Sequence, residues 1–238
     1  MSPWLDPAFW TPAFESRFVR SVRALERAVT DRMVPAFDGI ELEADAVTEE
    51  AYDAFGRQPA TDQWDMADAA EWAQEKGLEH YEELSDTRQA LLNLCTSALF
   101  HLVEQQLLFF HRRQVLDPSE EYDSALFSWK AMSKRLQEFG IDLVGIKKST
   151  GLDELELVAN VVKHGDGRSA DELRERKAIV LVPELLRDDP GFTSRVAGRI
   201  DGPLSGDGVY VSVSDFRRYA DVAVSFWREL ARAVRATG

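Results

Sequence analysis

Apolar residues recur every three or four positions along most of this sequence, and that spacing constrains the fold more than any other feature. It is the spacing of one face of an α-helix. The segment from Thr87 to Arg113 shows it most clearly and predicts a long helix, with Arg112 and Arg113 suited to the negative end of the helix dipole. The residues predicted to form its buried face are Leu91, Leu94, Cys95, Ala98, Leu102 and Leu108.

The same pattern predicts a helix near each end of the chain. Thr11 followed by Pro12 is typical of a helix start, because threonine caps free N–H groups and proline suits the first turn. From there the apolar spacing continues to Met33. Ser214 is the expected cap of the last helix, which is predicted to run through Ala236.

Further helices are predicted between these two. One begins after Ser119 and ends at Gly140, where glycine suits a helix terminus. A second spans Leu152–His164 and is stopped by a glycine-containing turn. Ser169 and Glu172, three positions apart, predict a capping box for a brief third helix.

Residues 177–210 are the least regular part of the sequence. Three prolines and several glycines disfavour long helices there. Alternating apolar and polar residues predict one short strand or hairpin near 207–213. No repeat or linker divides the chain, so we expect residues 1–238 to form one all-α domain, a bundle of about six to eight helices.

The negative charge of the chain is concentrated in one stretch. Sixteen Asp or Glu and only two basic residues, Arg57 and Lys76, lie within residues 38–86, so this stretch accounts for the whole net charge of −14. It predicts two helices, at 44–55 and 65–83. Such a stretch repels nucleic-acid phosphates, and it suits either solvation or a basic protein partner. The rest of the chain is balanced in charge, which leaves room for a small RNA site.

The sequence also indicates where the protein works. Cys95 is the only cysteine, which excludes an intramolecular disulfide. The first residues do not resemble a secretion signal, and the longest apolar run is shorter than the roughly 18 residues that a membrane span needs. We therefore expect a cytoplasmic protein that does not enter the membrane.

Polar residues gather on one side of the predicted helix 152–164. Glu156, Asn160, Lys163 and His164 lie three or four positions apart and form a single stripe. The stripe ends at a helix C-terminus, where the dipole favours a cationic imidazole. Such a set can bind a phosphate or transfer a proton near neutral pH. The alternative is that Asn160 and His164 only tie the helix end to its neighbours by hydrogen bonds.

His101 and Glu104 interrupt the apolar run of the longest predicted helix. Their spacing of three places both on one face. A buried carboxylate needs a partner, and Lys163 or His164 would supply one, which would bring the two helices together at one polar site. The alternative is that Glu104 simply faces water.

Other kinds of site lack their sequence signals. The four histidines do not fall at the spacing of zinc ligands. Gly165-Asp166-Gly167 follows a helix, whereas phosphate-binding glycine loops precede one. No serine- or cysteine-nucleophile motif is present. We expect neither a metal nor a cofactor.

The polar Asn-x-x-x-His pattern that ends one helix, together with an acidic residue on an earlier long helix, resembles the HEPN superfamily. These helical domains are frequent in bacterial toxin–antitoxin and antiphage systems. The phrases FHLVEQQ, LELVANVVKHGDGRSA and SFWREL are also similar to those of uncharacterised bacterial proteins of this length. The HEPN-like core covers residues 87–164.

The resemblance implies specific roles for the candidate residues. His164 matches the HEPN histidine and Asn160 the polar position, while Ala159 stands where those nucleases have arginine. The implied activity is metal-independent RNA cleavage, in which His164 acts on the 2′-hydroxyl or the leaving oxygen. Lys163 would steady the phosphate, and Asn160 and Glu104 would orient these groups. A homodimer is implied as well.

Two functions stay open at this point. One is a HEPN-like ribonuclease or RNA-binding effector of bacterial defence or stress response. The other is a non-catalytic interaction module that binds a basic protein partner through residues 38–86. The candidate catalytic residues are His164, Lys163 and Asn160, and the supporting ones are Glu104, His101 and Glu156.

Overall fold

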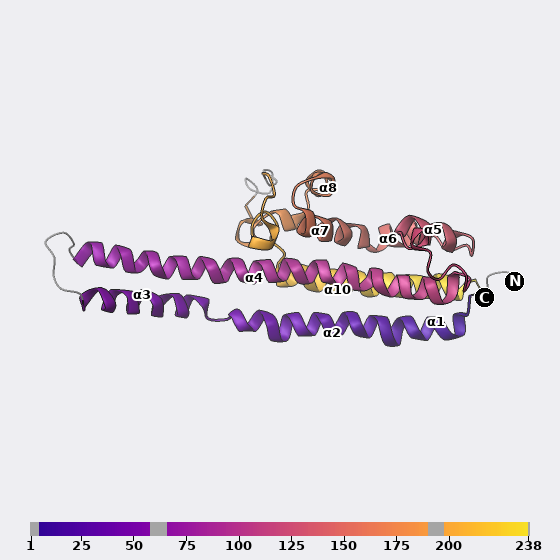
Figure 1. Cartoon of the computed structure of the whole chain (residues 1–238), viewed down its shortest axis with the longest axis horizontal. Helices are drawn as coiled ribbons and strands as arrows, with labels where there is room; N and C mark the ends of the chain where they lie inside the picture. Colours follow the sequence, from indigo (N-terminus) through magenta and orange to yellow (C-terminus); the bar gives the residue numbers. More distant parts are fainter. Residues whose placement is uncertain (1–4, 58–65, 190–197, 238) are drawn as a thin grey trace.

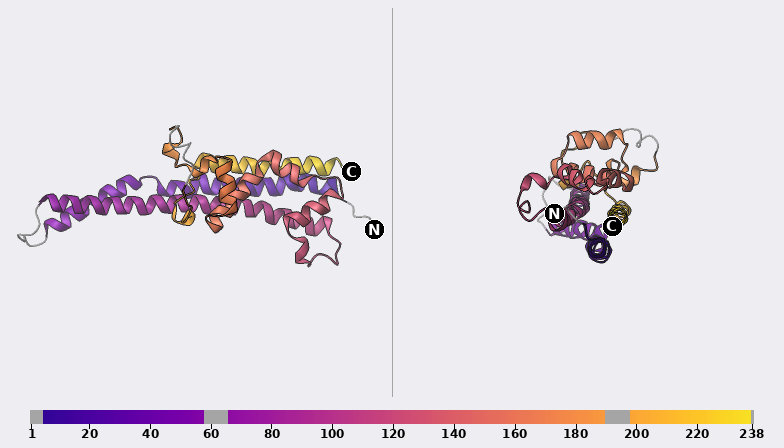
Figure 2. Two further views of the ribbon diagram at one scale, coloured as in Figure 1. Left: turned by 90° about the horizontal axis from the view of Figure 1, so that it is seen from above. Right: turned by 90° about the vertical axis from the view of Figure 1, so that its right-hand side faces the viewer.

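The computed structural model describes residues 5–57, 66–189 and 198–237, and these residues form an elongated all-α structure (Figure 1). The predicted all-α fold is therefore confirmed. A layer of short helices lies along one side of the longer ones, as the end-on view in Figure 2 shows. Among the described residues, no helix combines the length and apolar character needed to cross a bilayer.

The first helical segment is continuous from Pro7 to Phe37. It comprises α1 (Pro7–Ala13) and α2 (Arg20–Ala28), joined and extended by the π-helical turns Phe14–Val19 and Val29–Met33, and it ends in a 3-10 turn. The predicted start at Thr11 is wrong. Asp6 caps the helix by accepting a hydrogen bond from the Phe9 N–H at 3.1 Å, and Thr11 is buried inside the helix.

Helix α4 (Met66–Phe110) is 45 residues long and merges two helices that the sequence predicted separately. By the usual rise it extends about 68 Å. No proline interrupts it, and the predicted break near Thr87 does not occur. The Thr87 hydroxyl donates to the Glu83 carbonyl at 2.7 Å, a bond that threonine makes inside a helix rather than as a cap.

Helix α3 (Ile40–Gly56) packs against the first half of α4, and the pair extends beyond the other helices (Figure 1). Small residues of α4 allow this close packing: Ala69, Ala73 and Gly77 are buried there. A Cβ at Gly77 would lie only 1.9 Å from the Thr48 Oγ1 of α3. We call this pair of helices, within the described residues 38–57 and 66–86, the acidic arm.

The main core lies where α10 (Val213–Arg235) packs against the N-terminal segment and the second half of α4. Trp227 is its centre: its ring stacks on Phe14 at 5.5 Å and meets the edge of Phe18 at 4.7 Å between centroids. All three side chains are almost completely buried. Helix α10 begins two residues earlier than predicted, because Ser212 and Asp215 form its capping box.

The short helices α5 (Trp129–Gln137), α6 (Leu143–Thr150), α7 (Leu152–His164) and α8 (Arg168–Glu175) form the second layer (Figure 1). Helix α7 matches the predicted bounds, packs on α4 and runs antiparallel to it. The predicted capping box of α8 is not formed, because the helix already begins at Arg168 after Gly167, so that Ser169 lies inside it; Glu172 pairs with Arg176 at 2.5 Å.

The segment after α8 is irregular, as predicted, with only short 3-10 turns at Ile179–Leu181, Glu184–Leu186 and Pro203–Ser205; residues 190–197 fall outside the description. The strand predicted near 207–213 is absent from the described residues. Tyr210 makes one backbone bond, to the Val180 carbonyl at 2.7 Å.

Side chains of α4 take the place of a neighbouring strand. The Val209 and Val211 carbonyls accept hydrogen bonds from Asn93 and Gln89, at 2.8 and 3.0 Å. With these carbonyls already occupied, the extended residues do not build a ladder.

The predicted buried face of α4 is offset from the actual one. Leu94 and Ala98 are exposed, although the sequence assigned them to the core. The prediction was offset because the face that is buried contains polar residues. Hydrogen bonds inside the protein offset the cost of burying them. The buried residues of this part of α4 are Leu92, Asn93, Thr96, Ser97, Leu99, Phe100, Val103, Leu107 and Phe110.

Candidate functional site

The predicted polar stripe of α7 reaches the surface at the end of the helix. Lys163 and His164 are exposed, and Asn160 is partly exposed. The opposite side, including Leu155, Val158 and Val162, is buried. Within the described part of the chain, no hydrogen bond or ion pair engages the side chains of Asn160, Lys163 and His164. These three groups are therefore available to a solute and do not tie the helix end to its neighbours.

Glu156, the fourth residue of the stripe, has a structural contact instead. Its carboxylate pairs with the Lys147 ammonium of α6. The same ammonium lies 4.5 Å from the centroid of the Trp129 ring, a cation–π distance. Glu156 therefore joins α7 to α6 and α5, and it does not act together with His164.

His101 and Glu104 contact each other rather than α7. The His101 Nδ1 and Glu104 Oε2 atoms are 3.1 Å apart on the surface of α4. The predicted contact of Glu104 with Lys163 or His164 is absent, because those residues lie at the other end of α7. Ser97 contacts the Ala159 carbonyl at 3.5 Å, and α7 runs antiparallel to α4 (Figure 1). Counting residues from that contact separates Glu104 from Lys163 by roughly 16 Å along the axes.

The turn after His164 is fixed by Arg174. Its guanidinium pairs with Asp166, and it donates to the Gly198 carbonyl at 3.0 Å and to Asp171 at 2.8 Å. Gly165 has a φ of +69°, and a Cβ there would lie 3.1 Å from the Ile200 carbonyl. The end of α7 is thus a rigid platform that presents an imidazole and an ammonium to solvent, where they can contact an anion such as a phosphate.

The acidic arm presents its charge to solvent over its whole length. All fourteen of its described acids are exposed. Within the described residues of the arm, the ion pairs are Lys76 with Glu79 at 2.6 Å, and His80 with Glu43 at 3.8 Å when His80 is protonated. Most of these carboxylates therefore keep their charge unneutralised.

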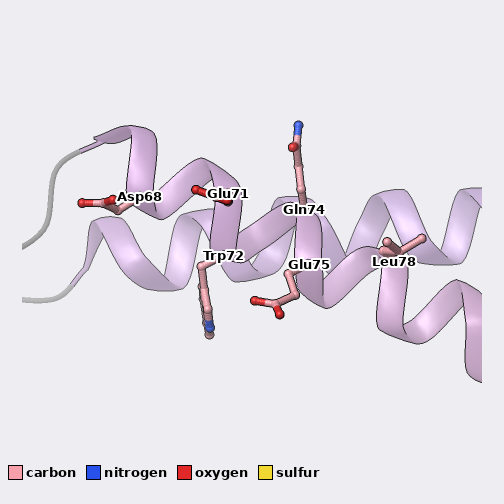
Figure 3. A pocket seen from close by; sticks show the side chains of 6 residues that line it. All are labelled: Asp68, Glu71, Trp72, Gln74, Glu75 and Leu78. Carbon is pink, nitrogen blue, oxygen red and sulfur yellow. The ribbon is translucent and has the colours of Figure 1, made fainter.

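The first turns of α4 add an aromatic and an aliphatic side chain to this acidic surface. Asp68, Glu71, Trp72, Glu75 and Leu78 help line a shallow hollow of about 520 Å³. Trp72 and Glu75 extend from the same side of the helix, and Gln74 extends from the opposite side (Figure 3). A flat indole beside carboxylates suits an ammonium or a guanidinium, which stacks on the ring and pairs with the acid.

Sequence reasoning found the acidic stretch but missed Trp72. The signal was present, because Trp72 lies three residues before Glu75 and one after Glu71. It also missed the exposure of Leu94 at the base of the arm, because Leu94 was assigned to the core. The described residues contain no cluster of three or more His, Cys, Asp or Glu side chains able to hold a metal ion.

Comparison of the chain with protein-family models, with curated proteins and with solved structures gives no match.

Proposed function

We propose that this protein is a non-catalytic interaction module that holds a basic protein partner against its acidic arm. One observation carries the proposal: a two-helix arm extends beyond the bundle with fourteen exposed acids on it. Such a concentrated field attracts a cationic surface and speeds its encounter. The same field repels the phosphates of nucleic acids, so we propose a protein as the partner.

The stiffness of the arm supports this proposal. Close packing at Gly77, where the backbones of α3 and α4 approach each other, holds the two helices as one body. Because the backbone of the arm is already ordered, only its side chains have to be ordered when a partner binds. Trp72 adds a contact that an isolated charge lacks, because its ring can stack on the cation of the partner.

Charge reversal on the arm tests the proposal. Glu71, Glu75 and Glu82 are exposed on α4, and the matched control reverses the exposed Glu175, Glu184 and Asp188 outside the arm. A fluorescent lysine-rich peptide is titrated into each protein at low and at physiological salt. We expect the triple Glu→Lys arm variant to bind at least about tenfold more weakly. The control, which has the same net charge, should bind like the parent.

Equal weakening of both variants would show that only total charge matters and would refute the proposal. Absence of peptide binding to the parent at physiological salt would refute it as well. Mass spectrometry of proteins retained from a lysate then identifies the partner, as a protein kept by the parent and the control and lost by the arm variant.

We propose, as a second candidate, a HEPN-like ribonuclease or RNA-binding effector at the end of α7, acting in bacterial defence or stress response. The exposure of Lys163 and His164 beside Asn160 supports it. In this proposal His164 acts on the 2′-hydroxyl or the leaving oxygen of RNA, and Lys163 neutralises the phosphate. A second copy of the chain would complete the site. HEPN nucleases place an arginine at the position that Ala159 occupies here, and Ala159 is buried. In this proposal Lys163 therefore supplies the positive charge that contacts the phosphate.

RNA integrity during expression tests the second candidate. We expect RNA fragments and slow growth with the parent protein, and neither with His164→Ala. His101→Ala is the matched control, because His101 is a half-exposed histidine on α4, away from the end of α7. Identical RNA profiles for the parent and a folded His164→Ala protein would eliminate the nuclease.

A further inference from the structure

An apolar hollow of about 500 Å³ lies where the acidic arm joins the bundle. Leu91 and Leu94 of α4 form one wall, and Leu204 of the turn Pro203–Ser205 contributes the other. Leu94 is 50% exposed and Leu204 54% exposed. Large apolar side chains gathered on a surface in this way mark an interaction site.

The hollow is already formed in the isolated chain. Asn93, which is completely buried, donates to the Pro203 carbonyl at 2.8 Å and thereby fixes the turn that carries Leu204. Gly206 has a φ of +85°, and a Cβ there would lie 2.8 Å from the Asp86 carbonyl. The turn therefore lies directly on α4, and its leucine does not need to move when a ligand arrives.

The charged residues around the hollow indicate the chemistry of the ligand that binds there. Asp86 lines the hollow itself, and Glu79 and Glu83, which lie within about 60° of Leu94 around the helix, are exposed on the preceding two turns of α4. The nearest base in the sequence, Arg88, points roughly 120° around the helix from Leu94. An apolar depression at one end of an acidic helical surface matches a ligand that has apolar anchors beside a row of cations.

We infer that the hollow and the adjoining arm together bind an amphipathic basic helix of a protein partner. Its apolar side chains enter the hollow, and its lysines or arginines lie along Asp86 and the glutamates that precede it. The distance from Leu94 to Glu79, about 22 Å, is that of a helix of about four turns. Helices bind grooves in this way through anchors spaced three and four residues apart. The inference rests on the proposed function of the arm and adds the structural class of the partner.

Two peptides separate the contribution of apolar side chains to the binding affinity from the contribution of charge. Both are amphipathic and carry the same lysines; one has leucines on its other face, and the second has alanines there. Binding to the parent, to Leu94→Ser/Leu204→Ser and to Glu79→Lys/Glu83→Lys is measured by fluorescence anisotropy. We expect the parent to prefer the leucine peptide by about tenfold or more. The double serine variant should lose this preference and keep its affinity for the alanine peptide.

The Glu79→Lys/Glu83→Lys variant provides the complementary result. It should bind both peptides more weakly and keep the preference for leucine. If the parent binds both peptides equally well, the hollow takes no apolar anchor and this inference fails, while the proposed function of the arm survives. If neither peptide binds, the function of the arm fails. Sedimentation of the protein alone adds one outcome. If the parent is a dimer and Leu94→Ser/Leu204→Ser is a monomer, the hollow binds a second copy of the chain and the inference is overturned.

Discussion

Replacing Asn93 by leucine is expected to lower the free energy of unfolding by about 3–5 kcal/mol, although leucine is apolar and close to asparagine in size. The Asn93 amide donates to the carbonyls of Pro203 and Val209, both at 2.8 Å. Its oxygen accepts from Gln89 at 3.1 Å and from the Val211 N–H at 3.4 Å. Leucine leaves these buried backbone groups without partners, and each such group costs about 1–3 kcal/mol.

Urea unfolding and hydrogen exchange check this prediction. The amides of Tyr210 and Val211 should exchange faster in Asn93→Leu, because the segment they belong to is held on α4 by this side chain. Ser97→Ala is the control, since Ser97 is buried one turn further along α4 and makes only a 3.5 Å contact. A leucine variant as stable as Ser97→Ala would mean that the segment does not depend on Asn93.

The helices were largely predictable from the sequence, and their ends were not. The bounds of α7 follow from a regular apolar spacing closed by a glycine. The length of α4 was missed because Ser85, Asp86 and Thr87 resemble a helix start. A threonine caps a helix only when a chain break leaves N–H groups free. Here the chain continues as a helix, and the Thr87 hydroxyl bonds back to the Glu83 carbonyl.

Some features of the candidate sites were likewise predictable from the sequence, and others were not. Spacing within one helix correctly predicted that Asn160, Lys163 and His164 share a surface. It did not reveal which residue of another helix faces them, since that depends on the direction and register of α7 against α4. The contact of Glu104 with α7 was wrong for this reason. The hollow beside Leu94 requires a turn more than a hundred residues away in sequence, and no local pattern predicts that approach.

His111 gives the chain a specific sensitivity to acid. It lies in the π-helical turn His111–Val115 that continues α4, and its side chain is completely buried. Neither ring nitrogen has a hydrogen-bond partner in the described part of the chain. Burial lowers the pKa of His111 from 6.5 to about 4; Arg135 adds to this shift, while the Leu126 backbone and Glu120 partly oppose it.

The sign of the effect follows from this lowered pKa. The folded protein favours the neutral form of His111. The contribution of this neutral form to the free energy of unfolding is therefore complete above 6.5, the pKa of His111 in the unfolded chain. That contribution is lost as the pH falls toward about 4, because the unfolded chain takes up a proton that the folded chain excludes. The shift corresponds to a loss of about 3 kcal/mol across this window.

Substitution of His111 by leucine should remove this part of the acid sensitivity. The difference in unfolding free energy between the parent and His111→Leu is measured by urea titration from about pH 7 to about pH 4, and it should change by about 3 kcal/mol. Because both proteins carry the same carboxylates, acid effects on those groups cancel in the difference. Parallel curves for the parent and His111→Leu would contradict the prediction, because they would show that protonation of His111 costs the folded chain nothing.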